Sequence, residues 1–206
     1  VHTGIPLRRG LIEAFERAPA RKAPEPPLHL LVFGGSQGAR QINEAMMDLA
    51  GSLAGRAVHV FHQTGETDRD RVAAAYAKAG VPATVVAFEP DMPGRYAWAD
   101  LAVCRAGALT VAELAMAGLP ALLIPYPHAA DDHQAANARA LAEAGAGRCI
   151  GSRPLDVAAL EAALFELIDH PDRLAPMSEA ARGLARPEAA ARVVEACVAL
   201  LEEGAR

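Results

Sequence analysis

The fold of this chain is decided by one stretch, Asp100-Leu-Ala-Val-Cys-Arg-Ala-Gly-Ala-Leu-Thr-Val-Ala-Glu-Leu-Ala-Met-Ala-Gly-Leu-Pro-Ala-Leu-Leu-Ile-Pro-Tyr-Pro127. An apolar run at 101–104 indicates a buried strand, a small-residue turn follows at 106–108, and a second apolar run occupies 121–124. Parallel strands need a crossover of about a dozen residues, usually helical, and this interval fits it. The stretch therefore predicts a strand, helix, strand unit whose polar turn lies at a strand's carboxyl end, where open α/β sheets bind ligands.

The same alternation extends to both sides of this unit. The apolar patterns predict further strands at residues 29–33, 57–61, 83–88 and 148–150, and helices at 42–53, 67–79, 92–99 and 132–144. Beyond residue 150 the pattern is only helical, over 156–169, 172–184 and 187–203. We therefore expect an α/β fold, a Rossmann-like doubly wound parallel sheet with a helical C-terminal tail.

The first 28 residues differ from the rest. They hold a short amphipathic pattern at 11–17 and then four prolines within residues 18–27, which is typical of a linker or an exposed loop. We expect residues 1–28 to be an interdomain segment and linker, and residues 29–206 to form the domain. Because the chain begins at Val1 with a sequence that reads as mid-protein, we also expect something to precede it.

Composition excludes several classes of function. The net charge is −5 and no run of Lys and Arg occurs, so nothing favours a nucleic-acid partner. No apolar run approaches the roughly 20 residues of a membrane span, and no signal peptide is visible. Three widely spaced cysteines, Cys104, Cys149 and Cys197, predict reduced, mostly buried thiols in a cytoplasmic protein.

The glycine turn at 34–39 is the first candidate site. Glycines let the backbone approach a ligand, and the amides that open the next helix favour anions such as phosphate. The turn is neither a Gly-x-Gly-x-x-Gly motif nor a Walker loop, so a nicotinamide cofactor and P-loop hydrolysis are not supported. A tight turn without a ligand explains this sequence equally well.

The second candidate is Gly107-Ala-Leu-Thr110 with Glu113. The amides of residues 108–110 and the Thr110 hydroxyl could hold a pyrophosphate, and Glu113 could accept hydrogen bonds from ribose hydroxyls. However, Thr-x-x-Glu is also a capping box, in which the two side chains satisfy helix amides. Local sequence alone favours the cap.

The third candidate lies at 128–137. His128, Asp131, Asp132 and His133 could suggest a metal site, but no His-Glu-x-x-His motif is present, and an aspartate that caps the helix is the simpler interpretation. Gln134 and Asn137 are three residues apart on one helical face. Their amides suit sugar hydroxyls, although solvation of a surface is the commoner reason for such a pair.

Catalytic residues are not predicted. No Gly-x-Ser-x-Gly elbow or Cys/His pair indicates a nucleophile, and His59 and His62 lie near a strand end where a structural role is expected. The three polar turns nevertheless all follow predicted strands. A doubly wound sheet would gather them along one edge, which makes a shared binding site the expectation.

With these segments in order, the sequence resembles the C-terminal half of the MurG family of N-acetylglucosaminyltransferases. The resemblance covers nearly the whole chain and rests on motifs at 4–8, 34–39, 62–65, 96–100, 104–113 and 117–120. Cys104-Arg-Ala-Gly-Ala-Leu-Thr-Val-Ala-Glu113 is the most specific of them. Ile5 and Ala106 depart from the usual Asn and Ser, and neither change removes a main-chain contact that the resemblance implies.

The resemblance implies a two-domain GT-B fold whose C-terminal domain binds the donor UDP-GlcNAc. The implied donor contacts are Arg8 and Ser36 at the diphosphate; Ala108, Leu109, Thr110, Val111, Ala112 and Glu113 at phosphate and ribose; the main chain of Glu89 at uracil; and Gln134 and Asn137 at GlcNAc, with His133 beside them. It implies no metal and no cofactor.

The implied activity is inverting transfer of GlcNAc to lipid I, which forms lipid II for peptidoglycan, the cell wall that determines cell shape and division. The family's N-terminal domain holds the acceptor, contacts the membrane and should supply the base, and this chain has no counterpart to it. We therefore expect a protein at the cytoplasmic face of the plasma membrane whose isolated chain is inactive. Two alternatives stay open, a UDP-sugar-binding subunit of a split glycosyltransferase and a UDP-GlcNAc 2-epimerase-like domain.

Overall fold

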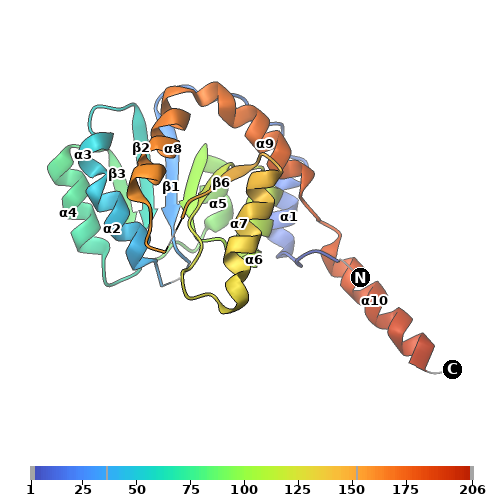
Figure 1. Ribbon diagram of the computed structural model, residues 1–206. Coiled ribbons are helices and arrows are strands. Elements are labelled where there is room, and N and C mark those ends of the chain that lie inside the picture. The colour runs from blue at the N-terminus through green and yellow to red at the C-terminus, as the bar shows by residue number, and fades with distance from the viewer. Residues whose placement is uncertain (1–2, 36, 152, 205–206) are drawn as a thin grey trace.

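A six-stranded sheet forms the centre of the protein in a computed structural model that describes residues 3–35, 37–151 and 153–204 (Figure 1). Every neighbouring pair of strands is parallel, and the order across the sheet is β3-β2-β1-β4-β5-β6. The strands are β1 (Leu28–Phe33), β2 (Val58–Gln63), β3 (Ala83–Val86), β4 (Leu101–Cys104), β5 (Ala121–Leu123) and β6 (Gly147–Cys149). This is the Rossmann order, so the expected fold class is confirmed.

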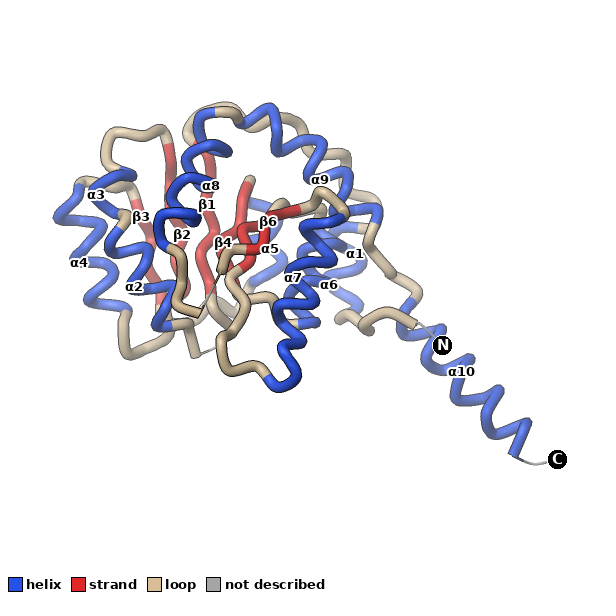
Figure 2. Tube along the Cα trace, viewed as in Figure 1, coloured by secondary structure: helices blue, strands red, loops and turns tan. Residues whose placement is uncertain are grey.

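Helices cover both faces of the sheet (Figure 2). They are α1 (Arg9–Phe15), α2 (Arg40–Asp48), α3 (Ala50–Leu53), α4 (Arg69–Ala79), α5 (Met92–Trp98), α6 (Ala108–Ala117), α7 (His133–Glu143), α8 (Val157–Asp169), α9 (Leu174–Gly183) and α10 (Ala189–Gly204), with 3₁₀ turns η1 (Ala130–Asp132) and η2 (Pro171–Arg173). One apolar cluster joins the sheet to α2, α3, α4 and α8, the other joins it to α1, α5, α6 and α7, and α9 contributes to both.

Strand β1 shows why its sequence is apolar without alternation. Leu30 and Val32 belong to the first cluster, whereas Leu31 and Phe33 belong to the second, because successive side chains point to opposite faces. All four are buried, and each contributes about 1.5–3 kcal/mol relative to exposure. A strand buried on both faces therefore reads as a continuous apolar run.

Most strand ends lie within one residue of those expected, but the C-terminal ends of two strands differ by two residues. Strand β2 runs to Gln63 because residues 58–63 pair one for one with all six residues of β1, so hydrogen bonding carries the strand into polar sequence. Strand β3 ends at Val86, two residues early, where it stops pairing with β2.

The expectation of mostly buried cysteines is wrong, since Cys104 is buried but Cys149 and Cys197 are exposed.

The segment before β1 is anchored to the domain, although most of its proline-rich part, residues 19, 20, 22, 23 and 25–27, is exposed as expected. Leu11 and Phe15 of α1 are buried in the second cluster. The Arg21 guanidinium donates to the carbonyl oxygens of Ala117, Ala99 and Tyr96, and the Arg182 guanidinium donates to two carbonyls of the segment, Ala18 O at 2.7 Å and Pro19 O at 2.8 Å. The proline-rich composition therefore describes an extended segment that is held in place.

The helical tail is present as expected. Helix α8 begins after Asp156, whose Oδ1 accepts a hydrogen bond from the Ala159 amide at 2.9 Å. The last helix, α10, leads away from the sheet and exposes Val194, Val198 and Leu201 (Figure 1). Among the described residues, no helix is long and apolar enough to cross a membrane.

Candidate functional site

Two cavities meet at the carboxyl edge of the sheet. The α5 cavity has a volume of about 660 Å³ and is lined by Arg8, Phe33, Phe88, Glu89, Tyr96, Leu109, Thr110 and Glu113, among others. The α2 cavity, of about 570 Å³, is lined by Gly34, Gly38, Arg40, Gln41, Glu44, Arg105, Gly107, Thr110, Tyr126, His128 and Gln134, among others. Because Thr110 lines both, the cavities adjoin at the start of α6. The prediction that the polar turns share one edge is confirmed.

The glycine turn interlocks with the loop after β2. Gly38 has φ of +76°, and a Cβ atom there would lie 1.8 Å from the carbonyl oxygen of Thr64. A Cβ on Gly65 would in turn lie 2.2 Å from the carbonyl oxygen of Gln37. Close packing thus explains part of the glycine pattern, while Gly34 and Gly38 also face the α2 cavity. Ser36, expected at the diphosphate, lies outside the described residues.

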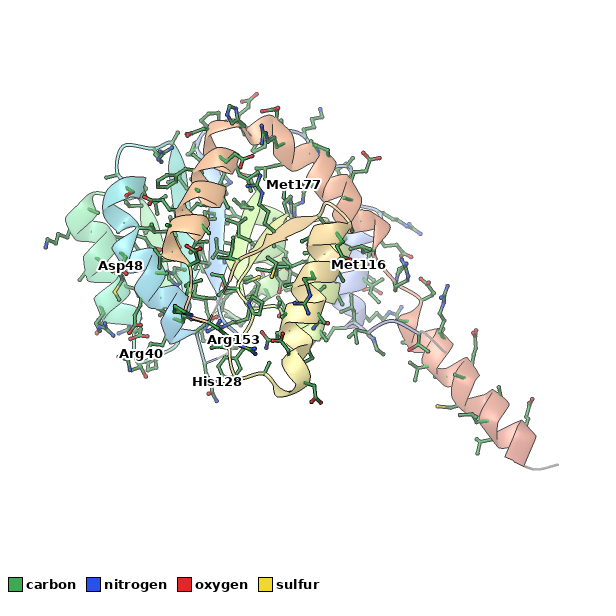
Figure 3. All side chains as sticks on the ribbon, viewed as in Figure 1. Arg40, Asp48, Met116, His128, Arg153 and Met177 are labelled. Atoms are coloured by element: carbon green, nitrogen blue, oxygen red, sulfur yellow. The ribbon has the colours of Figure 1, made fainter. Side chains whose placement is uncertain are left out.

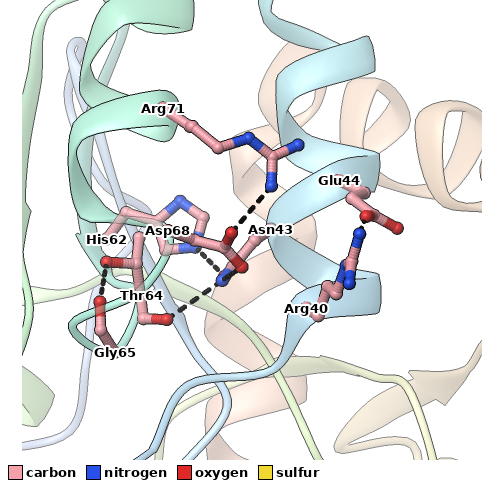
Figure 4. Close-up of polar contacts among 8 residues, drawn as sticks. All are labelled: Arg40, Asn43, Glu44, His62, Thr64, Gly65, Asp68 and Arg71. Carbon is pink, nitrogen blue, oxygen red and sulfur yellow. Dashed lines mark hydrogen bonds and ion pairs between the residues drawn. The ribbon is translucent and has the colours of Figure 1, made fainter.

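Beneath these loops lies the His62 network, a set of buried polar side chains (Figure 4). His62 Nδ1 lies 3.1 Å from the Tyr76 hydroxyl, and His62 Nε2 lies 3.0 Å from Asn43 Oδ1. Asn43 Nδ2 donates to Asp68 Oδ2 at 2.9 Å and to the Thr64 carbonyl at 3.0 Å. The network thus comprises His62, Tyr76, Asn43 and Asp68, with Arg71 paired to Asp68 at 2.8 Å.

The surroundings of His62 in this network determine the protonation state and the tautomer of its ring. Burial lowers the pKa of His62 to about 3, against a smaller opposing effect of Asp68, so the ring is neutral at pH 7. Asn43 uses its amide nitrogen as a donor, so its Oδ1 must accept, and the proton of the neutral ring is assigned to Nε2. The structural role expected for His62 is therefore confirmed.

The start of α6 has unpaired amides. Gly107 is the N-cap residue, and no described side chain caps the helix. Thr110 is the third residue inside α6, so the capping-box interpretation of Thr110 and Glu113 is wrong. Within the described part of the chain, the amides of Ala108, Leu109 and Thr110 have no acceptor. Such a helix end favours an anion.

Glu113 faces the α5 cavity, where Tyr96 holds it. The Tyr96 hydroxyl donates to Glu113 Oε2 at 2.7 Å, and burial together with the Glu113 charge raises the pKa of Tyr96, which keeps that hydroxyl a neutral donor. One hydrogen bond leaves a carboxylate with further acceptor sites. Sequence reasoning placed Tyr96 within a motif but gave it no role, since only the fold brings α5 against α6.

Glu89 turns its side chain into the protein. Its Oε1 accepts from the Asp91 amide at 2.8 Å, and its Oε2 pairs with Arg95 Nε at 2.7 Å. The Arg95 guanidinium also lies 3.9 Å above the centre of the Phe61 ring. Glu89 lines the α5 cavity with its carboxylate engaged in these contacts, and the contact of its main chain with uracil stays a prediction.

Gln134 and Asn137 serve different cavities although they share a helix. Gln134 lines the α2 cavity, and its Oε1 accepts from the Tyr126 amide at 2.9 Å. Asn137 Nδ2 donates to the Ala106 carbonyl at 3.0 Å and lines a third cavity, of about 480 Å³, with Ala108, Val111 and Ala112. Asn137 therefore supports the turn before α6, and its contact with a sugar stays a prediction.

The His128 to His133 segment is not arranged as a metal site. Among the described residues, no group of three or more His, Cys, Asp or Glu side chains is placed to hold a metal ion. Asp131 and Asp132 have φ of +48° and +55°. The aspartate cap is also wrong, because Asp132 pairs with Arg153 at 2.8 Å and makes no cap bond to α7. Arg153 also holds the Pro127 carbonyl, and Figure 3 shows it near His128 at the same edge.

Comparisons with known proteins agree with this geometry. Residues 29–193 match the family described as glycosyltransferase family 28 C-terminal domain. The chain is 47% identical over 199 residues to the UDP-N-acetylglucosamine--N-acetylmuramyl-(pentapeptide) pyrophosphoryl-undecaprenol N-acetylglucosamine transferase of Geobacter sulfurreducens, covering 96% of this chain and 55% of that protein. It thus spans about half the length of the curated relatives it matches.

Solved structures give the same result. A crystal structure of Acinetobacter baumannii MurG superimposes with a TM-score of 0.76 at 36% identity, over 90% of this chain and 52% of that one. A UDP-GlcNAc 2-epimerase from Neisseria meningitidis, bound to UDP-GlcNAc, superimposes with a TM-score of 0.58 at 12% identity, over 92% of this chain and 48% of that one. At 12% identity the second likeness concerns the fold alone.

Proposed function

The chain belongs to the family of glycosyltransferase family 28 C-terminal domains, as a MurG-type member, and from this premise we propose that it is the half of an N-acetylglucosaminyltransferase that binds the donor UDP-GlcNAc. The observation that carries the proposal is the pair of adjoining cavities that share Thr110 at the uncapped start of α6. The chemical structure of a nucleotide sugar matches this arrangement, because a nucleoside and a sugar lie on either side of its diphosphate.

The nucleoside lies in the α5 cavity under this proposal. The Glu113 carboxylate, held by Tyr96, accepts hydrogen bonds from the ribose hydroxyls. The main chain of Glu89 contacts the uracil, and the ion pair of Glu89 with Arg95 keeps that turn in place. Arg8 lines the same cavity and is the cation for the nearer phosphate.

The diphosphate and sugar follow toward the α2 cavity. The free amides of Ala108, Leu109 and Thr110 bind phosphate oxygens, supported by the helix dipole. Gln134 reads the hydroxyl or acetamido groups of GlcNAc from the far wall. Asn137 acts from behind by holding the carbonyl of Ala106, so that the turn before α6 keeps its shape.

We propose a single, inverting displacement. The acceptor hydroxyl oxygen of lipid I forms a bond to C1 of GlcNAc while the bond from C1 to the distal phosphate oxygen breaks, and that electron pair leaves with UDP. The hydroxyl proton passes to a base, which we place in the acceptor-binding half of the whole enzyme. The amides of α6 stabilise the leaving charge, because they are oriented before the reaction begins.

The whole enzyme then acts at the cytoplasmic face of the plasma membrane, where lipid I is the acceptor and lipid II the product. The chain alone binds donor but turns nothing over until an acceptor-binding half is supplied, whether in the same polypeptide or in another. No contact among the described residues favours the epimerase alternative over this one.

Calorimetric titration of the 206-residue chain with UDP, UDP-GlcNAc and UDP-glucose tests the proposal. We expect UDP and UDP-GlcNAc to bind, and UDP-glucose to bind no more tightly than UDP, because the wall at Gln134 is suited to the GlcNAc ring. If neither UDP nor UDP-GlcNAc binds at millimolar concentration, the donor site is refuted. Turnover of UDP-GlcNAc and lipid I by this chain alone would refute the placement of the base.

A further inference from the structure

Arg105 is a charged residue in the α2 cavity for which the family motif gave no role. It follows β4 directly, at the carboxyl edge of the sheet, and lines the cavity together with Gly107 and Thr110. We propose that Arg105 binds the distal phosphate of the nucleoside diphosphate sugar, the phosphate bonded to the sugar, and so makes the site selective for diphosphates over monophosphates. This inference rests on the proposed donor function.

The guanidinium of Arg105 is fixed by one of its two terminal nitrogens. Nη1 donates to Gln41 Oε1 at 3.0 Å, to the Pro125 carbonyl at 3.0 Å and to the Ile124 carbonyl at 3.2 Å. The N–H groups of Nε and Nη2 have no hydrogen-bond partner within the described ranges. Arginine carries five N–H donors in a planar fork, so a set of donors is held in a fixed direction and remains available.

The charge of Arg105 is not neutralised by the protein. All three of its acceptors are neutral oxygens, and none of the carboxylates in the described residues forms an ion pair with it. Partial burial lowers the pKa of Arg105, which nevertheless stays charged at pH 7. A half-buried cation that lacks a carboxylate partner attracts an anion from the cavity that it lines.

Arg40 provides the contrast within the same cavity. It pairs with Glu44 one helical turn away at 2.8 Å, and its side chain is 77% exposed. A screened, neutralised surface pair has little attraction for a ligand. The charge available to an anion in the α2 cavity is therefore that of Arg105.

The position of Arg105 selects the distal phosphate. Glu113 and Glu89 line the α5 cavity, where the nucleoside lies, and Thr110 marks the boundary between the two cavities. A diphosphate that crosses this boundary leaves its first phosphate beside the nucleoside and its second inside the α2 cavity. UMP has only the first phosphate, so it cannot reach Arg105 while its base and ribose are bound.

Affinities of the full 206-residue chain for UDP and UMP, measured by calorimetry, test this assignment. For Arg105→Gln we expect affinity for UDP to fall about tenfold or more and affinity for UMP to change less than about twofold, so the ratio of the two constants collapses. Arg105→Lys keeps a charge but loses the fork, and should lower the ratio by a smaller factor. Arg40→Gln is the matched control, and its ratio of UDP affinity to UMP affinity should stay within about twofold of wild type.

A supporting role alone would give a different pattern. If Arg105 only holds the Ile124 and Pro125 carbonyls, its loss disturbs the sheet edge and lowers the melting temperature, while the ratio of UDP to UMP affinity is unchanged. That result, in Arg105→Gln or in Arg105→Lys should the first variant not fold, overturns the assignment. Wild-type protein that binds neither UDP nor UDP-GlcNAc would instead overturn the donor function, and the role of Arg105 with it.

Discussion

Two polar regions lie side by side at the carboxyl edge of one sheet, and they differ in how their hydrogen bonds are used. In the His62 network, both ring nitrogens of His62 and the whole amide of Asn43 are engaged by protein groups. At the start of α6, three amides have no acceptor among the described residues, and Tyr96 is the one described residue that donates to the Glu113 carboxylate. The first region stabilises the loops, and the second is open to a ligand.

This difference separates structural from binding residues more clearly than residue type does. A buried polar group is costly when unpaired, so a group that the protein leaves unpaired at a cavity is paired there by water or by a ligand. His62 and Glu113 are both ionisable, and each lies in one of the motifs that carry the family resemblance. The hydrogen-bond partners of His62 give it a structural role, whereas Glu113 keeps acceptor sites at the α5 cavity and is therefore the candidate for a ligand contact.

The largest expected effect comes from breaking the His62 network. Asn43→Ala removes the partners of His62 Nε2 and the Thr64 carbonyl and one partner of Asp68, all in buried surroundings. We expect the free energy of unfolding to fall by about 3 kcal/mol, measured by urea denaturation. Below its melting temperature, the variant should bind UDP within about threefold of wild type.

Glu44→Ala is the control on the same helix. Glu44 pairs with Arg40 at the surface, so its loss should change the free energy of unfolding by no more than about 0.5 kcal/mol. Equal losses in the free energy of unfolding for the two variants would show that the His62 network stabilises the protein no more than a surface ion pair does. A loss of UDP binding by folded Asn43→Ala would show that the two regions are not separable.

A smaller effect should follow from acid. His62 is neutral in the folded protein with a pKa of about 3, whereas the unfolded value is about 6.5. Between these values the unfolded chain binds the additional proton, so stability decreases as pH falls below about 6.5. From pH 7 to pH 5 this one group should remove about 2 kcal/mol from the free energy of unfolding.

The variant His62→Gln isolates that contribution. Gln cannot titrate, and its amide can still donate to Asn43, so the pH dependence of the variant should be weaker than that of wild type by about 2 kcal/mol over the same interval. Subtracting the two urea-denaturation curves cancels the effects of the other histidines. Parallel curves for the two proteins would contradict the neutral, buried state of His62.

Much of this comparison was accessible from sequence. The doubly wound parallel sheet followed from the alternation of strand and helix patterns, and the gathering of the polar turns followed from the rule that parallel strands end at one edge. The capping box failed because the helix begins at Ala108, two residues before Thr110, with Gly107 in the extended conformation of an N-cap residue.

Tertiary contacts account for what sequence could not predict. The bond from Tyr96 to Glu113 joins residues 17 apart, and the bond from Arg105 to Gln41 joins residues 64 apart. Neither has a local pattern. Gln134 and Asn137 share a helical face by spacing, yet they line separate cavities and bond to different loops, Gln134 to the Tyr126 amide and Asn137 to the Ala106 carbonyl.

The donor side of the comparison is tested by Glu113→Ala. Loss of the carboxylate should lower affinity for UDP about tenfold, equivalent to about 1.4 kcal/mol, because one or two hydrogen bonds to ribose are lost. Tyr96→Phe is the control, since it leaves the carboxylate in place but frees its rotamer, and it should weaken UDP by about threefold at most. Equal affinity of Glu113→Ala and wild type would remove Glu113 from the site.

Gln134→Ala should produce the smallest change and the most selective one. Gln134 lines the α2 cavity, away from Glu113 in the α5 cavity, so its loss should leave affinity for UDP unchanged. Affinity for UDP-GlcNAc should fall about three- to fivefold, since one neutral hydrogen bond contributes about 1 kcal/mol. Calorimetric titration of both ligands measures the ratio. An equal loss of affinity for UDP would mean that Gln134 acts by holding the Tyr126 amide in place. Gln134 would then belong with the structural residues, and fewer groups at this edge of the sheet would be available to a ligand than line the two cavities.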